Sequence, residues 1–172
     1  MKHIVLVMVL WLMIGDCFAL SSAEQRMKAM FIYNFSNFVQ WSDSAFKNEN
    51  LKICLYGNVP FAKDMVHFEG VPVRDRKLKF IITSNLKEIE FGCHILYVGI
   101  DETENLQTFF KNINHNFVLS VGNVDGFVQK GGIINILRTS DQRKFEINLK
   151  KAQESGLNMS TDLLELARVI KQ

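Results

Sequence analysis

Apolar side chains recur at helical spacing between residues 24 and 41, a stretch that contains neither Gly nor Pro. Its largest apolar residues stand three or four positions apart: Met27, Phe31, Phe35 and Phe38. This spacing predicts a helix over residues 24–41. Other apolar residues widen the apolar arc to about 200°, well beyond the roughly 100° stripe that faces a single core. We therefore expect the helix to be covered on two sides, either inside one domain or by a dimer or partner contact.

Strand-like and helix-like runs alternate over the middle of the chain. Helical spacing predicts short helices at 61–68 and 106–113. Short runs rich in apolar and β-branched residues predict strands at 51–56, 78–83, 93–98 and 117–121. This alternation predicts a single α/β domain, residues 24–172, with a mainly parallel central sheet flanked by helices.

A C-terminal β-hairpin is expected after Gly131-Gly132, because strand-like runs at 133–138 and 143–149 flank four polar residues. Alternation of period two places Glu146 and Asn148 on one face of the second strand. The apolar side chains of that strand lie on the opposite face, which we expect to be the buried one.

Ser160 is expected to cap a terminal amphipathic helix, with Asp162 in its first turn. The apolar residues that follow have helical spacing: Leu163, Leu166, Ala167 and Ile170. We expect this helix to dock by one face.

The first 23 residues have the composition of a cleavable signal peptide. A charged start precedes an uncharged apolar run, residues 4–14, and small residues follow it. A membrane-spanning helix needs roughly 20 residues, so this run is too short to anchor the mature protein. Cleavage after Ala23 fits the small-residue rule better than cleavage after Ala19. A lipid anchor on Cys17 is the competing interpretation, although Asp16 replaces the small residue that usually precedes such a cysteine.

Export changes how the cysteines are interpreted. After signal cleavage two remain, Cys54 and Cys93, and outside the reducing cytoplasm they can form a disulfide. Two separate buried thiols are the alternative. The formal net charge is +2, with acidic and basic residues interspersed, so the chain lacks the basic surface that nucleic-acid binding requires.

No catalytic or metal-binding motif stands out. The four histidines have no zinc-site spacing, and although Cys54, Cys93 and His94 could supply soft ligands, a disulfide accounts for the cysteines more simply. The chain has no Gly-x-Ser-x-Gly nucleophile motif and no glycine-rich phosphate motif. Acidic residues at 101, 102 and 104 are explained by the start of a helix. We therefore expect no catalytic residue, no metal and no cofactor.

Three stretches resemble the YfiR family of small periplasmic regulators. The first is Lys28 to Phe35, followed by Phe38-Val39-Gln40-Trp41; the second joins Ile53 to Gly57 with Cys93 to Leu96. The third contains these segments in order: Gly131 to Ile136, Phe145 to Leu149, Ala152, Gly156-Leu157 and Leu163 to Arg168. Ser42 stands where the family often has a proline, and a second cysteine pair found in some members is missing.

The resemblance implies a periplasmic, non-enzymatic repressor, which acts as a homodimer. It would bind the periplasmic sensor domain of an inner-membrane diguanylate cyclase or sensor kinase, lowering cyclic di-GMP and biofilm formation. For the partner surface we expect outward-facing residues near the hairpin: Ile134, Glu146, Asn148 and Ala152. The alternative is a periplasmic protein that binds a small ligand at the carboxyl ends of the strands.

Overall fold

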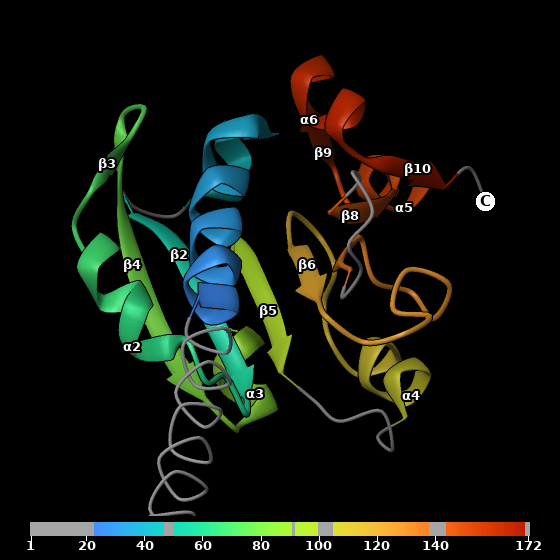
Figure 1. Cartoon of the computed structure of the whole chain (residues 1–172), viewed down its shortest axis with the longest axis horizontal. Coiled ribbons are helices and arrows are strands. Elements are labelled where there is room, and N and C mark those ends of the chain that lie inside the picture. Colours follow the sequence, from blue (N-terminus) through green and yellow to red (C-terminus); the bar gives the residue numbers. More distant parts are fainter. Residues whose placement is uncertain (1–22, 47–49, 91, 100–104, 138–143, 171–172) are drawn as a thin grey trace, which may run out of the picture.

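Eight strands form the central sheet in the computed structural model, which describes residues 23–46, 50–90, 92–99, 105–137 and 144–170. Neighbouring strands are parallel except for the pairs β7–β8 and β3–β4. The expected α/β fold with a mainly parallel sheet is confirmed. The spatial order is β10 (Arg168–Ile170), β8 (Phe145–Asn148), β7 (Ile134–Ile136), β6 (Leu119–Gly122), β5 (Ile95–Gly99), β2 (Asn50–Gly57), β4 (Arg76–Thr83) and β3 (Pro72–Val73) (Figure 1).

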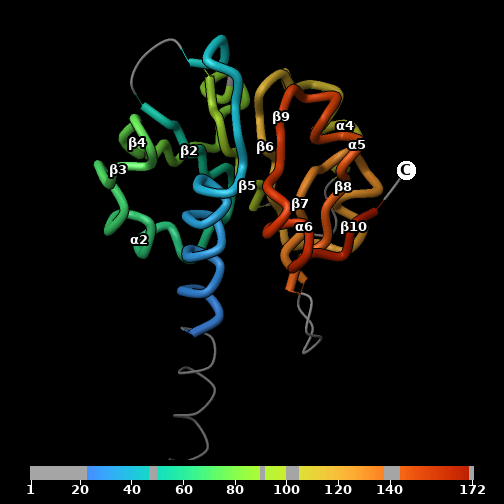
Figure 2. The backbone as a smooth tube through the Cα atoms, turned by 90° about the horizontal axis from the view of Figure 1, so that it is seen from above, coloured from blue at the N-terminus to red at the C-terminus, as the bar shows by residue number. Residues whose placement is uncertain are grey.

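Each face of the sheet carries its own apolar cluster. Alternate side chains of β2 enter different clusters, with Ile53 and Leu55 in one and Cys54 in the other. The first helix, residues 23–38, runs beside β2 and β5 in both views of the backbone (Figures 1 and 2) and packs into the first cluster. The other helices are α2 (Ala62–Met65), α3 (Leu86–Glu90), α4 (Leu106–Lys111), α5 (Leu149–Glu154) and α6 (Thr161–Leu166).

The first helix is shorter than its apolar spacing predicts. It ends at residue 38, and Val39–Trp41 form strand β1 instead. This strand pairs antiparallel with β9 (Leu157–Met159), more than a hundred residues later in the chain. Pairing with a distant segment thus overrides local helical spacing.

The chain buries one side of the first helix and leaves part of its apolar arc exposed. Ala29, Ile32 and Phe35 are buried, whereas the side chain of Met30 is 57% exposed. The described residues of one copy therefore cover the second side only in part.

The C-terminal hairpin is present as β7 and β8, with Ile134 opposite Ile147; its loop, residues 139–142, lies outside the described part. The prediction that the second strand continues to Leu149 is wrong. The side chain of Asn148 accepts a hydrogen bond from the backbone N–H of Lys151 and caps α5, so Leu149 begins a helix.

The terminal helix begins as expected and ends early. The Ser160 hydroxyl accepts from the backbone N–H of Leu163 and caps α6. The helix ends at Leu166, which is exposed, and the following strand β10 pairs in parallel with β8. Ile170 therefore lies on a strand, which the helical spacing did not predict.

Two glycines hold the ring of Phe127 between them. This side chain is fully buried, and a methyl group added to Gly122 or Gly132 would lie 2.3 or 2.2 Å from its ring atoms. Such a separation is far inside van der Waals contact, so neither position has room for a larger residue. These two glycines therefore serve close packing.

Replacing Gly132 with alanine is expected to lower the free energy of unfolding by about 2 kcal/mol, because the new methyl group overpacks the ring of Phe127. Urea unfolding followed by circular dichroism measures the loss. Combining Gly132→Ala with Phe127→Leu should cost less than the two single changes together, because the smaller side chain makes room. Strictly additive losses would show that the ring contact does not explain the effect.

Candidate functional site

The side chains that were expected to form the partner surface are buried. The hairpin lies inside the sheet, since β8 is flanked by β7 and β10, and all four residues of β8 are buried, so both of its faces are covered. Glu146 is 5% exposed and accepts a hydrogen bond from Asn135, and Asn148 is 7% exposed and donates one to the carbonyl of Val128. The expectation that these residues face outward is wrong: Ile134, Glu146, Asn148 and Ala152 are all buried.

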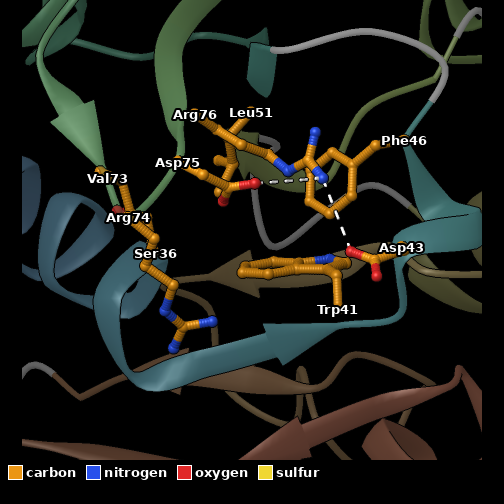
Figure 3. A pocket seen from close by; sticks show the side chains of 9 residues that line it. All are labelled: Ser36, Trp41, Asp43, Phe46, Leu51, Val73, Arg74, Asp75 and Arg76. Atoms are coloured by element: carbon orange, nitrogen blue, oxygen red, sulfur yellow. Dashed lines mark ion pairs between the residues drawn. The ribbon is translucent and has the colours of Figure 1, made fainter.

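An open pocket of about 190 Å³ lies elsewhere, where the end of the first helix, β1 and the β3–β4 turn meet (Figure 3). It combines aromatic walls with two arginines and two aspartates. Its lining residues are Ser36, Trp41, Asp43, Phe46, Leu51, Val73, Arg74, Asp75 and Arg76. We call it the Trp41 pocket.

Arg76 forms the cationic centre of the Trp41 pocket. Its guanidinium carbon lies 3.6 Å from the centre of the Phe46 ring, a cation–π geometry. Asp43 and Asp75 each place a carboxylate oxygen 3.6 Å from a guanidinium nitrogen (Figure 3). Both carboxylates are largely exposed, so water screens these ion pairs and they contribute little stability. A ligand carboxylate could therefore replace either partner at small cost.

Arg74 stands at the tip of the β3–β4 turn in an unusual backbone conformation. Its φ is +55°, in the left-handed region that favours glycine. Its guanidinium donates a 2.9 Å hydrogen bond to the carbonyl of Asn37, near the end of the first helix. The side chain thus ties the turn to the helix and closes one side of the Trp41 pocket (Figure 3).

The indole ring of Trp41 forms another wall of the Trp41 pocket. The indole Nε1 donates a 2.9 Å hydrogen bond to the carbonyl of Phe117, which lies shortly before β6 in the chain. This bond fixes the ring plane and connects β1 to the other half of the sheet. Trp41 belongs to one of the stretches that resemble the family. Nothing in the sequence predicted that Arg74 and Arg76 would lie beside it.

His94 supports the pocket from behind and does not line it. Its ring stacks on Phe46 with centroids 4.4 Å apart. Nδ1 accepts a hydrogen bond from the backbone N–H of Lys52 at 2.9 Å, and Nε2 donates to the carbonyl of Ala45 at 3.3 Å. Burial lowers the pKa of His94 to about 4, so the ring is neutral near pH 7.

A disulfide joins Cys54 and Cys93, with their Cα atoms 5.8 Å apart, which is the pairing that the sequence predicted. It connects β2 to the residues just before β5, and both cysteines are buried. Within the described part of the chain, no group of three His, Cys, Asp or Glu residues could hold a metal ion. The acidic residues at 101, 102 and 104 lie outside that part.

The Trp41 pocket is equipped for binding more than for bond breaking. Ser36, a hydroxyl among its lining residues, donates its hydrogen bond to the carbonyl of Tyr33 within the first helix. Its hydroxyl proton is therefore engaged by a backbone carbonyl, whereas Trp41, Phe46 and Arg76 offer aromatic faces and a guanidinium. Such a set suits an aromatic or carboxylate group of a ligand or partner.

No helix among the described residues combines the length and apolar character needed to cross a bilayer. No curated protein matches the chain. A family match, however, covers residues 25–168, from the first helix through both cysteines to the start of β10. That match confirms the resemblance drawn from the three sequence stretches. The chain belongs to the family described as YfiR/HmsC-like (DUF4154).

Proposed function

We propose that this protein is a periplasmic, non-enzymatic regulator that binds the periplasmic domain of an inner-membrane diguanylate cyclase and represses it, lowering cyclic di-GMP and biofilm formation. The family match over residues 25–168 is the observation that carries the proposal. The disulfide suits an oxidising compartment, and the Trp41 pocket suits binding. Export would be accompanied by signal cleavage after Ala23, which the mass of the mature protein would test.

The partner surface in this proposal moves from the buried hairpin to the rim of the Trp41 pocket. Aromatic residues and arginine are the side chains that most often carry binding energy at interfaces, and Trp41, Phe46 and Arg76 meet here. The hairpin residues would act indirectly, by supporting the sheet. We further propose that two copies associate through the exposed side of the first helix around Met30, which light scattering on a Met30→Glu variant would test.

Deleting the gene in its host is expected to raise cyclic di-GMP severalfold, because a repressed cyclase would become active. Mass spectrometry of cell extracts measures the level. Complementation with the wild-type gene should restore it, whereas Arg76→Glu should restore it poorly, since the charge reversal removes the cation at the pocket centre. Lys79→Glu, an equal charge reversal at an exposed position of β4, is the matched control and should restore it fully.

An unchanged cyclic di-GMP level after deletion would contradict repression of a cyclase. Equal failure of Arg76→Glu and Lys79→Glu, with both proteins present at wild-type amounts, would contradict the assignment of the partner surface. These two outcomes are independent, so the function and its surface are tested separately.

A second candidate function is small-ligand binding, which the size and aromatic lining of the Trp41 pocket favour. A ligand that binds only the folded state raises the melting temperature. Screening aromatic carboxylates against the wild type and a Phe46→Ala variant would test it: a rise that depends on Phe46 supports this function, and no rise with any compound contradicts it.

A further inference from the structure

We propose a second binding site, specific for phosphate-bearing ligands, between α4, the turn at residues 129–131 and α5. A concavity of about 480 Å³ opens there, on different elements from those around the Trp41 pocket. Its cationic residues come from three separate segments: Lys111 from α4, Lys130 from the turn and Lys151 from α5. This site is additional to the proposed regulatory function and does not depend on it.

The charge in this concavity is unbalanced. None of its lining residues is acidic. The ion pairs in the described part of the chain involve Lys28 and Arg76 but none of the three lysines here. Lys151 also helps to lower the pKa of the neighbouring His115, behind the larger effect of burial. Three lysines that line one concavity give it a positive potential, which a multiply charged anion would neutralise.

The base from which the lysines project is fixed. Gly131, at φ +112°, packs against Phe110, and a methyl group added to it would lie 3.3 Å from the ring. His115 makes a hydrogen bond through Nε2 to the carbonyl of Phe110, which holds the loop after α4 against that helix. Asn148 caps the helix that carries Lys151. A fixed base lowers the entropic cost of binding.

The number of lysines favours a phosphate monoester or pyrophosphate over a singly charged anion. Three ammonium groups match the two or more charges of a phosphate monoester or pyrophosphate better than the single charge of a carboxylate. The volume accommodates a small phosphate-bearing molecule or a lipid headgroup. Nucleic acid does not fit, because the formal net charge of the whole chain is only +2 and the basic residues form no extended stripe.

Calorimetric titration of the mature protein with pyrophosphate at low salt is expected to show saturable binding. The double variant Lys111→Gln/Lys130→Gln should weaken it by at least about tenfold, since two charge-assisted contacts to the anion are lost. Both lysines are exposed, so the fold should tolerate the change. Lys63→Gln/Lys79→Gln removes the same charge at exposed positions elsewhere and should bind as the wild type does.

Flotation with vesicles distinguishes the sources of phosphate. Binding to vesicles that contain phosphatidic acid, whose headgroup is a phosphate monoester, but not to phosphatidylcholine vesicles would support a lipid headgroup, provided that this binding is lost in Lys111→Gln/Lys130→Gln. Pyrophosphate binding without flotation would support a soluble phosphate ester. If the protein bound neither pyrophosphate nor the anionic vesicles, the proposed site would be overturned. Equal loss of binding in Lys111→Gln/Lys130→Gln and Lys63→Gln/Lys79→Gln would overturn it as well. Cyclic di-GMP levels are measured separately, so failure here leaves the regulatory proposal standing.

Discussion

Loss of the Cys54–Cys93 disulfide is expected to lower the free energy of unfolding by about 4 kcal/mol. The bond closes a loop with a sequence separation of 39 residues, and the chain-entropy model assigns a loop of this length about that stabilisation. It also joins β2 to the segment leading into β5, two central neighbours in the sheet. A large fraction of the stability of a domain this size would therefore depend on one bond.

Urea unfolding of the oxidised wild type, the reduced wild type and Cys54→Ala/Cys93→Ala measures the effect. Both cysteines are buried, so reduction should be carried out on unfolded protein before refolding. The reduced wild type and the double variant should both unfold at lower urea, and reductant should leave the double variant unchanged. Equal midpoints for the oxidised and reduced wild type would contradict the prediction.

Burial of this disulfide bears on its role. A solvent-accessible pair could exchange with periplasmic thiols, but Cys54 and Cys93 lie inside the apolar cluster shared with α3 and α4. We therefore expect the bond to serve stability more than redox sensing.

The central strands β2 and β5 could be predicted from sequence because most of their residues are buried. The runs in β2 and β5 are almost continuously apolar and end at glycines, Gly57 and Gly99, and such runs are typical of parallel sheets. The short strands β1, β9 and β10 could not be predicted. Each has three residues and exists because a distant segment supplies its hydrogen bonds, which local spacing cannot indicate.

The candidate site was harder to predict for a related reason. Period-two alternation correctly places Glu146 and Ile147 on opposite faces of β8. It cannot predict that both of these faces are buried. The Trp41 pocket depends on the meeting of residues from β1 and the β3–β4 turn. Neither Arg74 nor Arg76 belongs to a motif, so only the folded chain reveals them beside Trp41.

The free energy of unfolding is expected to fall by roughly 3 kcal/mol because of His94 as the pH drops from about 6.5 to about 4. Each unit of difference between the folded and unfolded pKa of a group is worth about 1.4 kcal/mol. Burial lowers the pKa of His94 from 6.5 to about 4 in the folded chain. Above pH 6.5 the ring is neutral in both states, so the folded state keeps its full advantage. Between these values the unfolded chain binds a proton that the folded chain excludes, and the loss is complete near pH 4.

Urea unfolding of the wild type and His94→Asn at several pH values between 7 and 4 isolates this contribution. Asn Oδ1 can still accept from the backbone N–H of Lys52, whereas the bond to the Ala45 carbonyl is lost. The variant should be less stable at pH 7 but lose less stability on acidification. His67→Asn, at an exposed position, should follow the wild-type curve. Because carboxylates add the same acid sensitivity to all three proteins, parallel curves for wild type and His94→Asn would show that the neutral ring of His94 does not supply the pH dependence.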